Sequence, residues 1–156
     1  MNILKINGLN IEIGGKTDKK KLLEHKIKRL GLISRLIIKK ESGQIIWWSK
    51  NCGISCFEGN FNLYPNLDTS LGTNMMFGTS AYLFYKENVL EKVTFQLIGN
   101  AFAANMIFKK FYETSTETLG EPRNEGTRIT WNENQNKIIA EKGLNSPHVY
   151  FHWILK

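Results

Sequence analysis

Apolar and polar residues alternate most regularly near the end of the sequence, over residues 148–155. One face of this segment carries Val149, Phe151, Trp153 and Leu155. A period of two is that of a β-strand with one buried face, so we expect a strand whose other face, with His148 and His152, is turned to solvent. Similar patterns predict strands over 127–132 and 137–141, and a hairpin that joins 81–86 to 92–98.

The beginning of the chain has the strongest short hairpin signal. Residues 3–6 and 9–13 alternate on either side of the dipeptide Asn7-Gly8. Asn-Gly suits a type I′ turn, because both central residues of that turn need a positive φ. We therefore expect two short antiparallel strands here.

Two segments have apolar residues at helical spacing. The longer helix is predicted over 100–119, with Asn100 as its cap and Gly120 to Pro122 as its stop. Its core-facing side chains would be Phe102, Met106, Ile107, Phe111 and Leu119. The shorter helix is predicted over 17–30, capped by Thr17 or Asp18 and ended by Gly31.

Residues 32–50 allow two interpretations. The segment 32–39 continues a helical stripe, yet its β-branched residues and the turn-like 41–43 fit a strand that leads into 44–50. We favour the hairpin. On its second strand Trp47 and Trp48 point to opposite faces.

The middle of the chain is predicted to contain little regular structure. Residues 54–64 are expected to be extended. Residues 65–80, rich in Asn, Gly, Ser and Thr, are predicted to form the longest loop. Such loops are often functional, although we favour a surface connection with Met75 and Phe77 tucked onto the core.

These elements predict a single α+β domain over residues 1–156. We expect antiparallel sheet of about 7–9 strands, with two main helices packed on one face. A strand, a helix, a glycine and a hairpin follow one another in both 11–50 and 93–141. This order suggests a duplicated strand–helix–hairpin unit.

The composition is that of a globular protein. The 156 residues are 42% hydrophobic and 22% charged, which is too apolar for a disordered chain. No apolar run approaches the roughly 20 residues that span a bilayer, and the first residues lack the pattern of a signal peptide. We therefore expect a cytoplasmic protein with no membrane segment.

Basic residues are concentrated in the first third of the chain. Residues 1–50 contain 12 Lys and Arg against 4 Asp and Glu, a net charge of +8, whereas 51–156 contain 9 against 10, a net charge of −1. The helix predicted over 17–30 carries Lys19, Lys20, Lys21, Lys26, Lys28 and Arg29. Such a segment attracts nucleic acid, anionic lipid or an acidic protein. Lysine predominates over arginine, and arginine is the better reader of phosphate.

The sequence contains no motif that names a reaction. Cys52 and Cys56 have no Cys/His partners at zinc-like spacing. His148 and His152 would stand roughly 13 Å apart on one strand, too far to chelate an ion together. We assign His25 a surface role. We therefore expect no catalytic residue, no metal and no cofactor, and keep a small enzyme with a Cys/His pair as an alternative.

The layout of several stretches suggests a family. The sequence KINGLNIEIG at 5–14 is followed by a short helix, Gly31 and IIWWSKNCGI at 45–54, and LGEP at 119–122 is followed by Thr130-Trp131. This layout resembles small bacterial proteins, some of which look like immunity proteins of toxin–immunity systems. The chain lacks the Pro that usually follows Gly31, and no functional residue carries over. The resemblance implies a protein that protects a bacterium by binding a toxin domain.

Charge and resemblance together favour a non-enzymatic protein-binding module, an immunity or inhibitor protein that neutralises a toxin domain through a basic face. Its partner would present an acidic surface. A nuclease is disfavoured as the target, because its inhibitor would itself be acidic. The contact residues that we expect are Lys19, Lys20, Lys21, Lys26, Lys28, Arg29, Trp48, Met75 and Phe77. The first alternative is a nucleic-acid-binding protein that uses the 17–30 helix.

Overall fold

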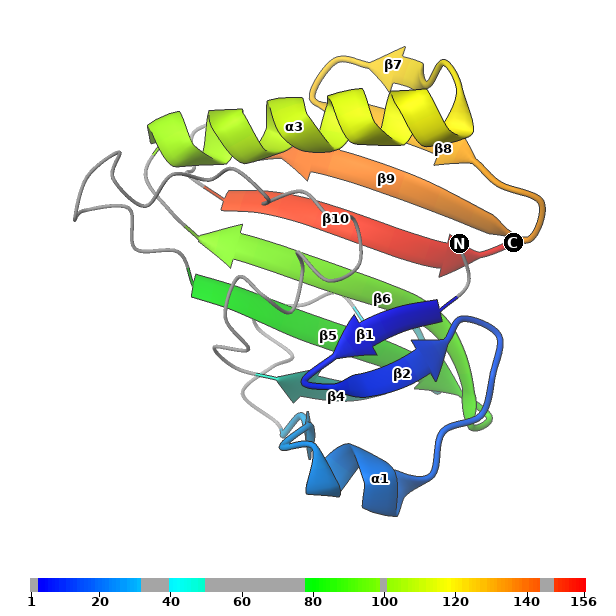
Figure 1. Ribbon diagram of the computed structural model, residues 1–156. Coiled ribbons are helices and arrows are strands. Elements are labelled where there is room, and N and C mark those ends of the chain that lie inside the picture. Colours follow the sequence, from blue (N-terminus) through cyan, green and yellow to red (C-terminus); the bar gives the residue numbers. More distant parts are fainter. Residues whose placement is uncertain (1–2, 32–39, 50–77, 99–100, 144–147) are drawn as a thin grey trace.

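The computed structural model describes residues 3–31, 40–49, 78–98, 101–143 and 148–156. They form two helices, α1 (Lys19–Glu24) and α3 (Ala101–Leu119), together with ten strands (Figure 1). The strands are β1 (Ile3–Ile6), β2 (Leu9–Glu12), β3 (Lys28–Arg29), β4 (Ile45–Ser49), β5 (Gly78–Lys86), β6 (Val89–Ile98), β7 (Arg123–Glu125), β8 (Arg128–Asn132), β9 (Asn136–Lys142) and β10 (His148–Leu155). The α+β class and the antiparallel sheet predicted from the sequence are confirmed.

Eight of these strands form one antiparallel sheet in the order β3-β4-β5-β6-β10-β9-β8-β7. The order contains two four-stranded meanders, β3 to β6 and β7 to β10, which meet where β10 pairs with β6. Each meander follows a described helix along the chain. The ranges 11–50 and 93–141 do not coincide with these meanders, and the duplicated unit stays a prediction.

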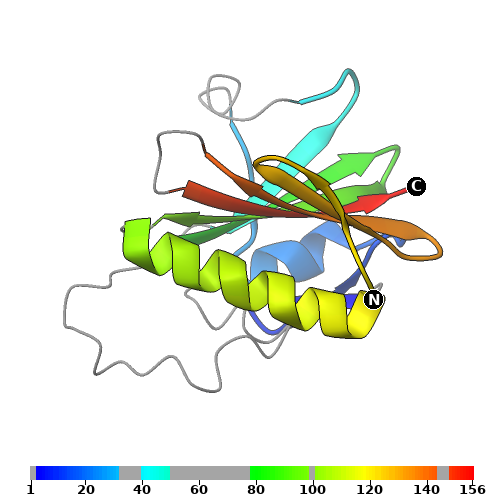
Figure 2. The same cartoon turned by 90° about the horizontal axis from the view of Figure 1, so that it is seen from above.

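One face of the main sheet is covered by a layer of helices and a hairpin. Figure 2 shows α1, α3 and the β1–β2 hairpin on the same side of the sheet. The helix α3 lies over β8, β9 and β10, and the hairpin lies over the other half (Figure 1). Neither described helix has the length and apolar character needed to cross a bilayer.

The β1–β2 hairpin is the turn that the sequence predicts. Asn7 and Gly8 have φ values of 48° and 81°, as a type I′ turn requires. Beyond β2, the Gly14 amide donates to the Leu90 carbonyl at 2.8 Å. At the turn itself, Asn7 Nδ2 donates to Ser49 Oγ at 2.6 Å. The hairpin is thus fastened to both β6 and β4.

Aromatic side chains form the core beneath α3. The ring centroid of Phe111 lies 4.1 Å from that of Phe151, 5.8 Å from Trp131 and 5.9 Å from Trp153. Phe95 meets Trp153 edge to face at 5.4 Å. All five residues are almost fully buried. The alternation over 148–155 and the helix at 101–119 are confirmed by this packing.

The helix predicted over 17–30 is wrong beyond residue 24. After α1, Lys26 adopts a φ of 59°, its amide donates to Leu23, and the Ile27 amide donates to Leu22 at 2.9 Å. These two bonds form a Schellman motif, and the two apolar residues at its ends, Leu22 and Ile27, both belong to the buried core. The chain then enters β3, so Lys28 and Arg29 belong to a strand.

Two other boundaries differ from the sequence prediction. The segment 65–80 was expected to be a loop, but Gly78 to Ser80 begin β5. The remaining residues of this segment lie outside the described residues, as do 32–39, 54–64 and Asn100. The strand β7 was not predicted, because all three of its residues are exposed and have no apolar periodicity.

We predict that Phe111→Ala lowers the free energy of unfolding by about 3–5 kcal/mol, because it opens a cavity between three aromatic rings. Urea unfolding followed by tryptophan fluorescence measures this change. Phe108→Ala, on the same helix but only partly buried, is the matched control and should lose clearly less. Equal losses for the two variants would contradict the central role of Phe111.

Candidate functional site

The face of the main sheet opposite α3 is covered by neither described helix and not by the β1–β2 hairpin (Figure 2). We call it the open face. The strand register aligns its side chains in rows across the sheet. The longest row contains Lys28, Trp48, Tyr82, Thr94, His152, Ile139, Thr130 and Arg123, from β3 to β7. His148 and His152 lie on this face, as predicted, although the His152 side chain is only 12% exposed.

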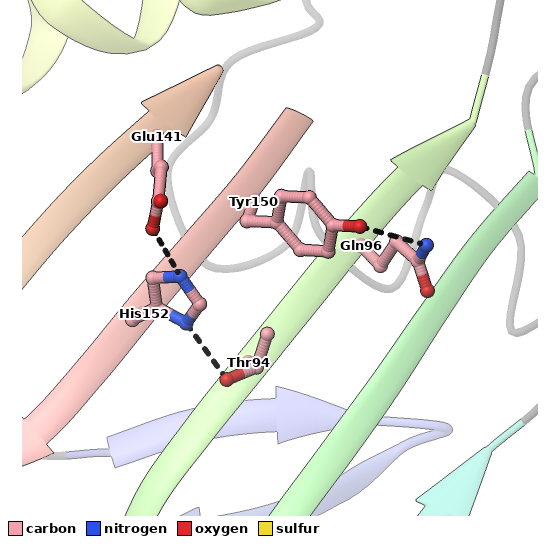
Figure 3. Close-up of polar contacts among 5 residues, drawn as sticks. All are labelled: Thr94, Gln96, Glu141, Tyr150 and His152. Carbon is pink, nitrogen blue, oxygen red and sulfur yellow. Dashed lines mark hydrogen bonds and ion pairs between the residues drawn. The ribbon is translucent and has the colours of Figure 1, made fainter. Parts of the chain in front are cut away.

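Thr94, His152 and Glu141 form a chain of hydrogen bonds across three adjacent strands (Figure 3). Thr94 Oγ1 lies 2.8 Å from His152 Nδ1, and His152 Nε2 lies 3.4 Å from Glu141 Oε2. Since an ionised carboxylate only accepts hydrogen bonds, we place the imidazole proton on Nε2, where it is donated to Glu141. Nδ1 then accepts from the Thr94 hydroxyl, and both ring nitrogens are satisfied.

Gln96 connects a second group of side chains on the same face. Its Oε1 accepts from the Tyr82 hydroxyl at 3.2 Å. Its Nε2 lies 3.0 Å from His148 Nδ1 and 3.4 Å from the Tyr150 hydroxyl (Figure 3). The Tyr150 ring is nearly parallel to the rings of His148 and His152, at centroid distances of 6.3 and 6.1 Å.

The two groups are neighbours on the sheet and form one cluster. We call it the polar network; it consists of Tyr82, Thr94, Gln96, Glu141, His148, Tyr150 and His152. Tyr82, Thr94 and Gln96 are no more than 9% exposed. Buried polar groups are expensive unless they are hydrogen-bonded, so these bonds hold each side chain in one orientation.

Two cations beside the polar network, Lys92 and Arg128, influence the pKa values of its side chains. Burial lowers the pKa of His152, and the positive charges of Lys92 and Arg128 lower it further, against the opposing effect of Glu141. The pKa of Glu141 is lowered mainly by its hydrogen bond with His152. Burial also lowers the pKa of Lys92, whose Nζ lies 4.9 Å from the centroid of the Phe84 ring. At neutral pH a neutral imidazole therefore stands beside an ionised carboxylate.

The polar network contains a hydroxyl, an imidazole and a carboxylate, the three groups of hydrolytic triads. The Thr94 hydroxyl donates to His152 as the nucleophile of such a triad does, but Thr94 is only 6% exposed, which leaves a substrate carbonyl little access to it. The chain of bonds therefore orders the open face. Cys52 and Cys56 lie outside the described residues, and within the described part of the chain no three His, Cys, Asp or Glu side chains are grouped so that they could hold a metal ion.

A second candidate site lies at the edge of the sheet. The basic surface consists of Lys16, Lys19, Lys20, Lys21, Lys26, Lys28 and Arg29. All seven are exposed, and none forms an ion pair with another described residue. Asp18 caps α1, its carboxylate accepting from the Lys20 amide at 3.0 Å, and His25 Nδ1 lies 2.9 Å from the Asn7 carbonyl. The contact between His25 and Asn7 fixes the C-terminal end of α1 against the β1–β2 hairpin.

The basic surface and the open face meet at the pair of Lys28 and Trp48. These residues are opposite each other in the β3–β4 register, and Trp48 packs beside Ile46, Tyr82 and Phe84. As predicted, Trp47 and Trp48 point to opposite faces: Trp47 is in the main core.

Seven of the nine contact residues expected from the sequence lie in the described part of the chain, with Trp48 on the open face and α1 on the covered side of the sheet. Lys19, Lys20 and Lys21 are on α1, Lys26 is in its terminating turn, Lys28 and Arg29 are on β3, and Trp48 is on β4. Met75 and Phe77 lie outside the described residues. The polar network was not predicted from the sequence, in which only the two histidines stood out. Their partners lie on other strands, and those on β6 are more than 50 residues away. No local pattern therefore connects them.

Comparison of the chain with protein-family models, curated proteins and solved structures finds no match. The function has to be argued from the two surfaces themselves.

We predict that Lys26→Gly stabilises the protein by about 0.5–1 kcal/mol. A lysine with positive φ is strained, whereas glycine adopts this conformation without a steric penalty. Thermal unfolding measures the change. Lys21→Gly, within α1, is the matched control and should destabilise by a similar amount. A loss of stability in Lys26→Gly would contradict the assigned Schellman motif.

A prediction on pH concerns His152. Because its pKa in the folded protein lies below the unfolded value of about 6.5, the unfolded chain binds more protons between these two values. The free energy of unfolding therefore falls as pH is lowered from 7 to 5, with a contribution from this residue of at most about 1.4 kcal/mol per pH unit. Glu141 adds a loss only below its own unfolded pKa of about 4.5.

Urea unfolding of the wild type and His152→Gln at pH 8, 7, 6 and 5 tests this prediction. The difference in stability between the two proteins should be constant at pH 8 and 7 and should shift in favour of the variant at pH 6 and 5. Titrations of groups that His152 does not contact cancel in that difference, and the series stops at pH 5, above the unfolded pKa of Glu141, the carboxyl whose pKa His152 lowers. A difference that does not change with pH would show that His152 is not held neutral.

Proposed function

We propose that this protein is a non-enzymatic, cytoplasmic protein-binding module, an immunity or inhibitor protein that neutralises a toxin domain with an acidic surface. The observation that carries the proposal is the basic surface: seven exposed cations without an ion pair to any described residue. A cluster of like charges repels itself, and a partner that brings carboxylates relieves this repulsion.

The chemistry of the basic surface favours a protein over a phosphate-rich partner. Six of its seven cations are lysines, which act as point charges and lack the bidentate geometry with which arginine reads phosphate. Lysines at the rim of an interface chiefly accelerate association and select partners by charge. Fast capture of a toxin is what an immunity protein requires.

The direct test of the immunity proposal uses the product of the neighbouring gene. Expression of that product alone should stop growth of a bacterial host, and co-expression of this chain should restore it. The two proteins should also elute as one stoichiometric complex from a size-exclusion column. A harmless neighbour, or one that stays toxic in the presence of this chain, would refute the proposal.

A charge-reversal prediction locates the contact. The triple charge reversal Lys19→Glu, Lys20→Glu and Lys21→Glu should raise the Kd for that partner at least about tenfold, mainly through slower association. The matched control reverses three lysines on or against α3, Lys109, Lys110 and Lys142, and changes the net charge equally. Surface plasmon resonance measures both. Equal weakening by the two triples would mean that only the net charge matters and that α1 is not at the contact.

A further inference from the structure

We propose that the open face is the part of this interface that selects the partner, and that it receives an acidic protein surface laid across β6, β10, β9 and β8. This inference rests on the proposed function, since it concerns the same acidic partner, but a different set of residues carries it.

The first observation is that the polar network is ordered before any partner arrives. Its cross-strand bonds, from Thr94 to His152 at 2.8 Å and from Gln96 to His148 at 3.0 Å, fix side chains that would otherwise lose rotamer freedom on binding. Ordering of such side chains is a main cost of association. Tyrosine is also among the residues enriched where binding energy is concentrated.

The second observation is the charge of the open face. Alternation along its strands places on this face, among others, the cations Lys28, Lys92, Arg123, Arg128 and Lys137 and the carboxylates Glu125 and Glu141. One of these carboxylates is paired with Arg123 at 2.8 Å, and the other accepts from His152. The face is therefore net positive. It complements an acidic surface and repels a second copy of itself.

The third observation is that the open face is continuous with the basic surface. The two share the Lys28–Trp48 pair, and the row that starts there leads through Tyr82 and Thr94 to His152. The lysines of α1 lie on the covered side of the sheet, so a partner drawn in by them reaches the polar network around the β3 edge, where Lys28 and Trp48 lie.

The geometry of the aromatic rings favours protein over single-stranded nucleic acid. Bases bind such proteins by stacking on exposed ring faces. The rings of His148, Tyr150 and His152 stand side by side along β10, with 6.3 and 6.1 Å between neighbouring centroids. A base inserted between two rings would need a stacking distance of about 3.4 Å on each side, which is more room than either gap provides. The ring faces are thus turned toward each other, which favours hydrogen bonding and edge contacts by a protein partner.

A defined acidic peptide tests this inference without the natural partner. Ten glutamates, blocked at both ends, span about 33 Å when extended, enough to run from β3 to β8, six strand spacings or about 29 Å away. The full chain labelled with ¹⁵N is titrated with this peptide at low salt. We expect shift changes at the basic surface and also at Thr94, Glu141, Tyr150 and His152.

Variants make the test specific. Arg128→Gln with Lys137→Gln should raise the Kd for the peptide about fivefold. Lys109→Gln with Lys110→Gln, on the exposed side of α3, removes the same charge and should leave the Kd unchanged. The unbound spectra of both double variants show whether each has kept its fold.

The outcomes separate this inference from the proposed function. Shift changes confined to the basic surface would refute the role of the open face and leave the proposed function standing. No binding at all would count against an acidic partner and hence against both. Tighter binding of a ten-residue oligo(dT), with shifts at Tyr150 and His152, would make nucleic acid the occupant. Self-association through the open face in sedimentation runs would make a second copy of the chain the occupant. Oligo(dT) binding and self-association would each overturn the inference.

Discussion

The pairing of β6 with β10 is the interaction on which both faces of this protein depend. It joins two meanders that are far apart along the chain, in a register that runs from His148 opposite Ile98 to Ile154 opposite Lys92. On the covered face this register brings Phe95 against Trp153. On the open face it brings Thr94 to His152. A slip by one residue would exchange the two faces, burying the histidines under α3 and exposing the aromatic core.

The parts of the fold that local chemistry determines could be predicted from the sequence. Asn7-Gly8 specifies its turn because few other dipeptides accept two positive φ values. The period of two over 148–155 specifies a half-buried strand, and the apolar spacing over 101–119 specifies a helix that covers it. In each case neighbours in sequence determine the conformation.

The features that were wrong or missed depend on distant contacts or on an unusual residue. The end of α1 was misplaced because a lysine, Lys26, occupies a position where glycine is the usual signal. The edge strand β7 has no apolar residue and exists because β8 offers it hydrogen bonds. The polar network joins residues such as Gln96 and His148, 52 positions apart, whose meeting depends on the order of strands in the sheet. No propensity or period encodes that order.

The polar network and the cations contribute to recognition in different ways. The hydrogen-bonding groups of the network satisfy one another, and His152 stays neutral beside the ionised Glu141, so the network itself does not attract an acidic partner. Attraction over a distance must come from Lys and Arg side chains, whose field extends about 8 Å at physiological salt. The network instead sets which shapes and edges fit once contact is made, because its side chains cannot rearrange without leaving a buried donor or acceptor unpaired. A partner with the right charge but the wrong surface would be drawn to the basic surface and then fail to bind at β10.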